Sequence, residues 1–193
     1  MLKILHRIND PSILAQTPKN LGVEMDIHGW ENTLTVHHDA HVKGFDIDLW
    51  LSNFNHAISI FNIKEEGVEK MVMEKILFNN IENFFFLDLS FPSLVKLVNL
   101  GEKRIAYRVS KYEPYNGALH FKNKLNWIWL DVFDGIPINK LEFNILKECN
   151  FKICLVSPEL HGREKGEIVD FKNFINKNDI LVDAVCTKHP EMW

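Results

Sequence analysis

The chain has 193 residues, of which 46% are hydrophobic and 25% are charged, and its formal net charge is −4. This length suffices to bury one good core and predicts a single domain over residues 1–193. The acidic balance argues against a nucleic-acid partner, and no apolar run approaches the roughly 18 residues that a membrane span requires.

The number and spacing of the cysteines predict the cellular compartment of the protein. The three cysteines, Cys149, Cys154 and Cys186, are odd in number and lack the spacing of zinc ligands. A disulfide framework is therefore not expected, and a reducing, cytoplasmic location fits best. The apolar run at the N-terminus is too short for a signal peptide.

Eight short segments rich in β-branched and aromatic residues predict strands. They cover residues 2–6, 22–28, 57–64, 83–90, 104–110, 127–133, 151–158 and 180–187. Their near-continuous apolar character is typical of strands that are covered on both faces. Parallel pairing is therefore expected.

Segments with helical spacing lie between several of these strands. They cover residues 45–54, 68–79, 92–100, 140–148 and 168–176. Strands alternating with helices predict an α/β fold, specifically a compact (β/α)₈ TIM barrel with right-handed crossovers. Because such barrels usually have about 200 residues or more, we expect some helices to be reduced to turns, with the connection 8–21 as a candidate.

Polar side chains collect where these strands end, which is where barrels carry their chemistry. Glu24 and Asp26 alternate along one strand, so they face the same side. Two carboxylates on an inner face repel each other unless a cation lies between them. The residues alone leave open whether that cation is a divalent metal or a neighbouring basic side chain.

Four motifs together resemble a known family. His6-Arg7 ends the first strand, Glu24-Met25-Asp26 is followed by His38-Asp39, Asn62-Ile63-Lys64 closes the third strand, and residues 182–190 end the chain. In this order they resemble the glycerophosphodiester phosphodiesterases, within the phosphatidylinositol-phospholipase-C-like phosphodiesterase barrels. Each motif is weak alone, and their joint order makes the resemblance specific.

The resemblance implies roles for the matched residues. His6 and His38 fall at the two catalytic histidine positions, and Arg7 and Lys64 at positions that bind the substrate phosphate. A candidate substrate contact is Glu159, in the loop after the seventh strand.

The resemblance also implies a divalent metal, Mg²⁺ or Ca²⁺, with ligands at the positions of Glu24, Asp26 and Asn62. Two departures bear on activity. Asn62 stands where the family has a third metal-binding glutamate, and Ile8 stands where it usually has glycine. A neutral amide oxygen is a weaker ligand for these cations than a carboxylate, so Asn62 is expected to weaken metal binding.

These residue types can supply what phosphodiester hydrolysis requires. Phosphodiester hydrolysis needs charge neutralisation on the non-bridging oxygens, a base for the nucleophile and an acid for the leaving alcohol. Two histidines titrating near neutrality can supply acid and base, although the sequence does not say which is which. A hydroxyl next to the phosphate, as in glycerol esters, would attack first and form a cyclic phosphate.

We therefore expect a phosphoric diester hydrolase that acts on a small glycerol- or polyol-type phosphodiester with the help of a divalent metal. Two alternatives stay open. One is a barrel that binds phosphate without catalysis, which Ile8 and Asn62 favour. The other is a metal-independent, phospholipase-C-like enzyme in which Arg7 or Lys64 does the work of the cation.

Overall fold

The computed structural model describes all 193 residues and shows a mixed α/β fold. The chain forms two compact units. The N-terminal unit comprises Leu5–Leu100, and the C-terminal unit comprises Gly101–Trp193 together with Met1–Ile4. The single domain over residues 1–193 stays a prediction.

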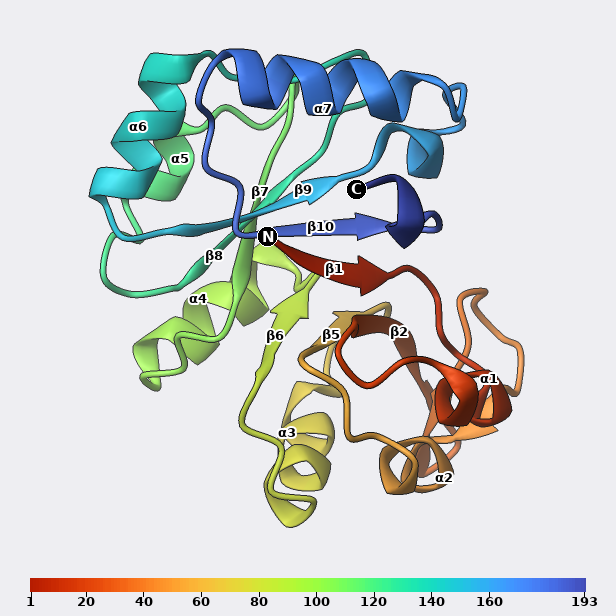
Figure 1. Cartoon of the computed structure of the whole chain (residues 1–193). Coiled ribbons are helices and arrows are strands. Elements are labelled where there is room, and N and C mark those ends of the chain that lie inside the picture. Colours follow the sequence, from red (N-terminus) through yellow and green to blue (C-terminus); the bar gives the residue numbers. More distant parts are fainter. The chain divides into compact units, whose positions relative to one another are not determined.

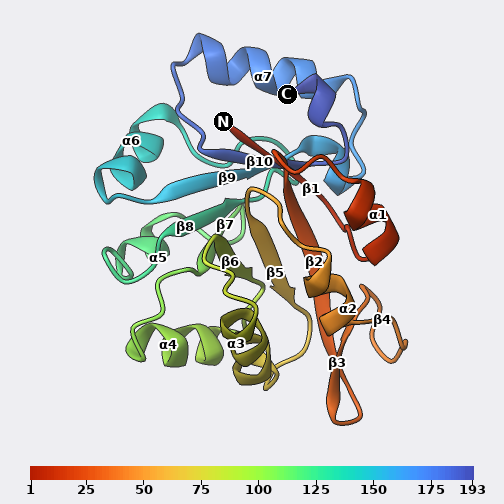
Figure 2. The ribbon, with the colours of Figure 1, turned by 60° about the horizontal axis from the view of Figure 1, so that its bottom comes forward.

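The N-terminal unit is built on a mixed sheet with the strand order β4-β3-β2-β5-β6. β2 (Gly22–Trp30) pairs in parallel with β5 (Ser59–Ile63), which pairs in parallel with β6 (Phe84–Leu87). At its other edge β2 is antiparallel to β3 (Thr33–Val36), and β3 is antiparallel to β4 (Phe45–Asp46). Figure 2 shows β2 continuing past the end of β5 into its hairpin with β3.

Four helices belong to this unit: α1 (Pro11–Gln16), α2 (Ile47–Ser52), α3 (Glu69–Phe78) and α4 (Phe91–Asn99). One connection and one helix boundary differ from expectation here. The connection 8–21, expected as a turn, contains α1, because the Asp10 side chain caps the first turn by accepting from Ser12 N. The segment 45–54 starts with a strand, because Phe45 pairs with Val36 before Asp46 caps α2.

The two faces of this sheet differ in chemistry because side chains alternate along each strand. On one face Phe61 lies 6.5 Å from Trp50 of α2 and 5.4 Å from Phe84 between ring centroids. The opposite face carries Glu24 and Asp26. The aromatic face forms a core, and the opposite face carries the two buried carboxylates.

The C-terminal unit has a parallel sheet of β7 (Ala106–Val109), β8 (Trp127–Leu130), β9 (Lys152–Val156) and β10 (Ala184–Thr187). The first residues of β1 (Leu2–Leu5) lie next to β10. Its helical segments are α5 (Asn116–Leu119), α6 (Lys140–Glu148), η1 (Pro158–His161), α7 (Glu167–Lys177) and η2 (Pro190–Met192). Figure 1 shows α7 running alongside β9 and β10.

All eight predicted strands and all five predicted helices are present, with the ends shifted by a few residues. The short strands β3 and β4 and the short helices α1 and α5 are additional elements. The α/β class is confirmed, and the parallel pairing is confirmed for β2, β5 and β6 and for β7 to β10. These pairings do not show a closed barrel, which stays a prediction.

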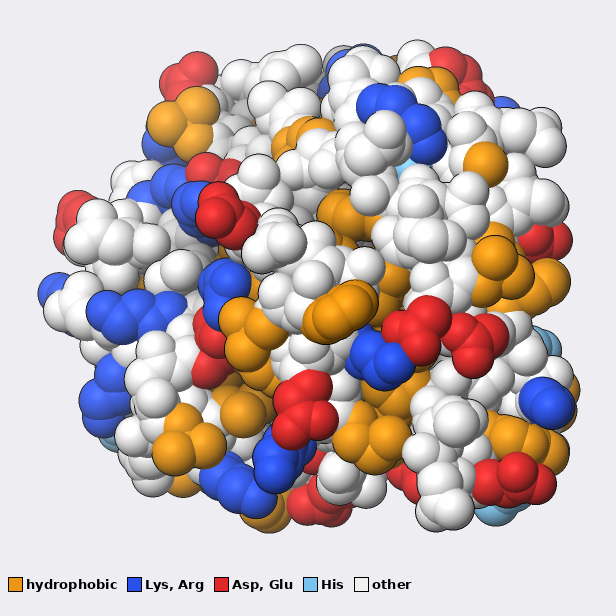
Figure 3. Space-filling view, turned by 90° about the horizontal axis from the view of Figure 1, so that it is seen from below, with side chains coloured by type: hydrophobic (Ala, Val, Ile, Leu, Met, Phe, Trp, Pro, Cys, Tyr) orange, Lys and Arg blue, Asp and Glu red, His pale blue; other side chains and the backbone are white.

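Acidic and basic side chains are interspersed on the face of the molecule in Figure 3, with no extended area of positive charge. None of the helices has both the length and the apolar character that crossing a membrane requires. The absence of a nucleic-acid partner and the cytoplasmic location stay predictions.

Candidate active site

Glu24 and Asp26 lie on the acidic face of β2, and both are fully buried, with 0% of their surface exposed. The parallel pairing of β2 with β5 puts Asn62 beside Asp26. Cross-strand partners share a face of the sheet, so the three side chains meet. The two carboxylates face the same side, as their spacing predicts.

Both oxygens of the Glu24 carboxyl group accept hydrogen bonds. Asn62 Nδ2 donates to Oε1 at 2.8 Å, and the backbone N–H of Arg7 donates to Oε2 at 2.7 Å. His6 Nε2 lies 3.9 Å from Oε2. Burial first, and then the charge of Asp26, raise the pKa of Glu24 to about 8 despite these hydrogen bonds. Glu24 can therefore hold a proton at neutral pH.

The Asp26 carboxylate is surrounded by nitrogen donors. Asn9 Nδ2 donates to Oδ2 at 2.9 Å, and Asp26 N donates back to Asn9 Oδ1 at 2.9 Å. Asn62 Nδ2 lies 3.3 Å and Lys64 Nζ 3.4 Å from Oδ1. Arg7 Nε is 4.0 Å from Oδ2. Two cations and two amides thus stabilise this buried charge.

Arg7 and Ile8 occupy the tight connection that follows β1. Arg7 has a left-handed backbone with φ 55°, whereas Ile8 does not have a positive φ. Ile8 N donates to Glu24 O at 2.8 Å, and Trp50 Nε1 donates to Ile8 O at 2.7 Å. Isoleucine is therefore compatible with this position, although the family usually has glycine there.

His38 is held at both ring nitrogens. Arg7 Nη2 donates to Nε2 at 2.5 Å, so Nδ1 carries the proton and donates to Asp39 at 2.8 Å. The hydrogen bond from His38 lowers the pKa of Asp39. His28 Nε2 donates to the backbone oxygen of His38 at 3.1 Å. His37 accepts instead from Asp39 N in its own loop, so His38 is the histidine that joins the cluster.

Lys64 lies between two carboxylates. Its Nζ is 3.1 Å from Asp88 Oδ2 and 3.4 Å from Asp26 Oδ1. Asp88 follows β6 directly and has a left-handed backbone with φ 57°. The Lys64 side chain keeps 20% of its surface exposed, whereas the Asp26 side chain is 1% exposed.

The predicted substrate contact, Glu159, belongs to the C-terminal unit. Thr187 Oγ1 and Lys188 N donate to its Oε1 at 2.6 and 3.0 Å, and Ser157 Oγ bonds to its Oε2. Burial alone would raise the pKa of Glu159, but the bonds from Ser157 and Thr187 bring it below its usual value. The carboxylate thus holds the end of β10, and its contact with substrate stays a prediction.

A second charged cluster stands where β8 of the C-terminal unit ends. Asp131 is 2% exposed, accepts from Trp129 Nε1 at 3.2 Å and pairs with Arg108. His161 Nε2 lies 3.1 Å from the same carboxylate. The buried carboxylate is thus paired with Arg108 and accepts from Trp129, whereas His161 Nε2 makes no hydrogen bond.

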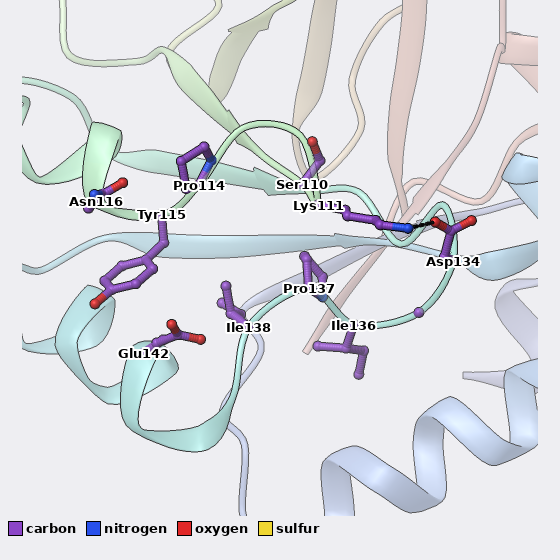
Figure 4. Close-up of a pocket in the computed structure, with 11 residues that line it drawn as sticks. Ser110, Lys111, Pro114, Tyr115, Asn116, Asp134, Ile136, Pro137, Ile138 and Glu142 are labelled. Carbon is purple, nitrogen blue, oxygen red and sulfur yellow. Dashed lines mark hydrogen bonds and ion pairs between the residues drawn. The ribbon is translucent and has the colours of Figure 1, made fainter.

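The C-terminal unit also contains a cavity of about 460 Å³. The Lys111–Asp134 ion pair, 2.7 Å long, stands at one end, and Tyr115 and Glu142 stand at the other (Figure 4). Ile136, Pro137 and other side chains complete its wall. None of the residues predicted for the site lines this cavity.

The predicted metal ligands do not fit a divalent cation as they are arranged. No group of three or more His, Cys, Asp and Glu side chains has a metal-binding arrangement. Asn62 turns its amide nitrogen toward both carboxylates, while its buried Oδ1 has no hydrogen-bond partner. Mg²⁺ and Ca²⁺ need converging oxygen lone pairs, and here a donor nitrogen stands between Glu24 and Asp26.

Sequence reasoning assigns no role to Asn9, Asp39 or Asp88, all of which join the cluster. Asp39 follows His38 directly, and an acidic neighbour of a candidate catalytic histidine is a usable signal. Asp88 ends a predicted strand, which marks it for the same rim. Asn9 follows the departure at Ile8, and no local signal identifies it.

No protein-family model and no curated protein matches this sequence. Solved structures do match it over nearly its whole length. The glycerophosphodiester phosphodiesterase from Agrobacterium tumefaciens has a TM-score of 0.67 at 13% identity, covering 100% of this chain and 99% of that chain. A protein from Galdieria sulphuraria, assigned as a glycerophosphodiester phosphodiesterase, has a TM-score of 0.69 at 12% identity, covering 99% and 95%. The likeness confirms, at the level of the fold, the resemblance to glycerophosphodiester phosphodiesterases seen in the sequence.

Proposed function

We propose that this chain is a phosphodiesterase that hydrolyses a small phosphodiester of glycerol or another polyol. The observation that carries the proposal is the contact network of Arg7, which touches His38, Glu24 and Asp26. Because of these contacts, the residues to which we assign acid–base catalysis and phosphate binding lie close together in the N-terminal unit. The fold likeness to solved glycerophosphodiester phosphodiesterases supports the same class of reaction.

Arg7 and Lys64 bind the phosphate in this proposal. Their side chains are 45% and 20% exposed, whereas the side chain of Asp26, with which both pair, is only 1% exposed. A phosphate can therefore reach the two cations without contacting the carboxylate. Charge-assisted hydrogen bonds to the non-bridging oxygens would stabilise the negative charge that grows in the transition state.

His38 is the general base. His38 Nδ1 carries the ring proton and donates it in a hydrogen bond to Asp39, so Nε2 has a free lone pair. Arg7 would leave Nε2 when it binds the phosphate. The substrate hydroxyl next to the phosphate loses its proton to Nε2. Its oxygen forms a bond to phosphorus while the bond from phosphorus to the leaving alcohol breaks.

His6 is the general acid. It gives a proton to the leaving oxygen, and the neighbouring Glu24 carboxyl, 3.9 Å away, positions its ring. The product of this step is a cyclic phosphate. Water then opens the ring while the histidines exchange roles, which leaves a phosphomonoester.

The test is hydrolysis of glycerophosphocholine by the purified chain, followed as choline release. We expect the wild type to release choline and His6→Ala to be slower by roughly 10²–10⁴-fold, the usual contribution of general acid–base catalysis. His120→Ala, which changes an exposed histidine, is the control and should keep the wild-type rate. Thermal stabilisation by this compound without choline release would replace the proposal with the binding-only alternative.

A further inference from the structure

We infer that the candidate site works without a divalent metal, because the Asn62 amide nitrogen stands between the buried carboxylates of Glu24 and Asp26 and the Lys64 ammonium already pairs with Asp26. For its catalytic part, the inference rests on the proposed phosphodiesterase function. It assigns to Lys64 the role of the central cation, which both neutralises Asp26 and meets the substrate phosphate.

The hydrogen bonds around the carboxylates carry the first step. Each of the four carboxylate oxygens has a nitrogen donor: Asn62 and Arg7 N on Glu24, and Asn62 and Asn9 on Asp26. The Asn62 amide nitrogen is 2.8 Å from one carboxylate and 3.3 Å from the other. A metal ion bound by both carboxylates would have to displace this nitrogen.

The position of Lys64 carries the second step. Its ammonium is 3.4 Å from Asp26 and 3.1 Å from Asp88, so it lies within ion-pair distance of two carboxylates at once. A nearby positive charge favours the ionised form of a carboxylate as a metal ion does. A divalent ion bound to the same Asp26 oxygen would lie a few ångströms from the ammonium and be repelled by it.

The residue type at position 62 carries the third step. A glutamate there would place a third carboxylate beside two that are 0% exposed, and such a cluster is stable only around a cation. Asparagine brings no charge and donates to both carboxylates. The opposite amide orientation would turn Oδ1 toward both groups and remove the hydrogen bonds that Nδ2 gives to Glu24 and Asp26.

The test of metal binding is calorimetric titration of the full chain with CaCl₂ and with MgCl₂. We expect no binding by the wild type, and calcium binding by Asn62→Glu with a Kd of roughly 10⁻⁴–10⁻³ M, the range of weak protein calcium sites. Calcium should also raise the Tm of Asn62→Glu but not of the wild type. Asn99→Glu, which adds the same charge on exposed α4, is the control and should bind no calcium.

Binding of Ca²⁺ or Mg²⁺ by the wild type with a Kd at or below that range would overturn the inference, even if Asn62→Glu fails to fold.

A second experiment measures activity. Choline release by the wild type should be unchanged by excess EDTA, and the rate of Lys64→Met should be lower by roughly a hundredfold, as when one transition-state donor is removed. Lys70→Met, at an exposed lysine of α3, is the control. Loss of wild-type activity in EDTA also overturns the inference. If no choline is released under any condition, the proposed function fails, and the titration still decides the question of the metal.

Discussion

His38 and its neighbour His37 differ in what they contact, and this difference can be measured. His38 bonds to Arg7 and Asp39, whereas His37 bonds within its own loop. We expect His38→Ala to lower kcat for glycerophosphocholine by roughly 10²–10⁴-fold, because the general base is lost. His37→Ala should stay close to wild type. Equal losses in the two variants would show that the loop, and not the imidazole of His38, matters.

The pKa of Glu24 predicts how stability depends on pH. Because burial and Asp26 raise it from 4.5 to about 8, the folded chain binds this proton more tightly than the unfolded chain. The stabilisation is complete below pH 4.5 and is lost as the pH rises through 8. We expect the free energy of unfolding, measured by urea denaturation, to fall between pH 5 and pH 9 by on the order of a few kcal/mol.

Glu24→Gln should flatten this decline, because its amide cannot ionise. Glu74→Gln, at an exposed position of α3, is the control and should keep the wild-type slope. The same slope in Glu24→Gln and wild type would mean that Glu24 does not carry the effect.

At the residue scale, the sequence predicted that Glu24 and Asp26 share a face, but it did not predict which side chains they contact. Alternation along a strand sufficed to put Glu24 and Asp26 on one face. The partnership of Asn9 with Asp26 was not predictable, because it joins a loop to a strand 17 residues away. The orientation of the Asn62 amide was not predictable either, because it is set by the hydrogen bonds that its nitrogen donates to the two carboxylates on β2.

At the scale of elements, the segment between β3 and β4 positions His38, and it has little free space. A side chain at Gly44 would bring its Cβ to 2.7 Å from His37 Cβ and into contact with the backbone oxygen of Val36. We expect Gly44→Ala to lower the free energy of unfolding by about 1–3 kcal/mol, the usual cost of overpacking, and to reduce hydrolysis by displacing His38.

Gly166→Ala is the matched control, because its Cβ would meet nothing within 4 Å. Its stability should stay within about 0.5 kcal/mol of wild type in the same urea titration. An unchanged Gly44→Ala would show that the β3–β4 segment can shift without cost.

The elements that the sequence analysis missed are short. β4 has two residues and α5 has four, too few for a periodic pattern to emerge. The six residues of α1 do carry a start signal in Asp10-Pro11. The hairpin of β2 with β3 was missed because the near-continuous apolar character of the long strands predicts parallel pairing. It does not reveal that the end of β2 pairs in antiparallel with β3.

At the scale of the whole molecule, phosphate should act as a stabilising ligand of the folded chain. A ligand at a hundred times its Kd adds about 2.7 kcal/mol, which for this length raises Tm by several degrees. We expect inorganic phosphate to raise the Tm of the wild type, measured by scanning calorimetry, more than that of Lys64→Ala. Lys70→Ala should respond as the wild type does, and an equal response of Lys64→Ala would remove Lys64 from the phosphate site.

The α/β class of the whole chain was predictable, because alternating strands and helices recur from end to end. The division into two compact units was not predictable, since no composition shift or linker marks residues 4–5 or 100–101. Closure of a barrel depends on pairing between strands far apart in sequence, which local patterns do not encode.

Phosphodiester hydrolysis with His38 as the base can be tested directly by a ³¹P NMR time course of glycerophosphocholine with the purified wild-type chain and with His38→Ala. We expect the wild type to convert the phosphodiester signal into that of a phosphomonoester, with a transient signal of the cyclic phosphate, and His38→Ala to leave the phosphodiester signal in place. A wild-type spectrum that does not change, or equal conversion by both proteins, would contradict this mechanism.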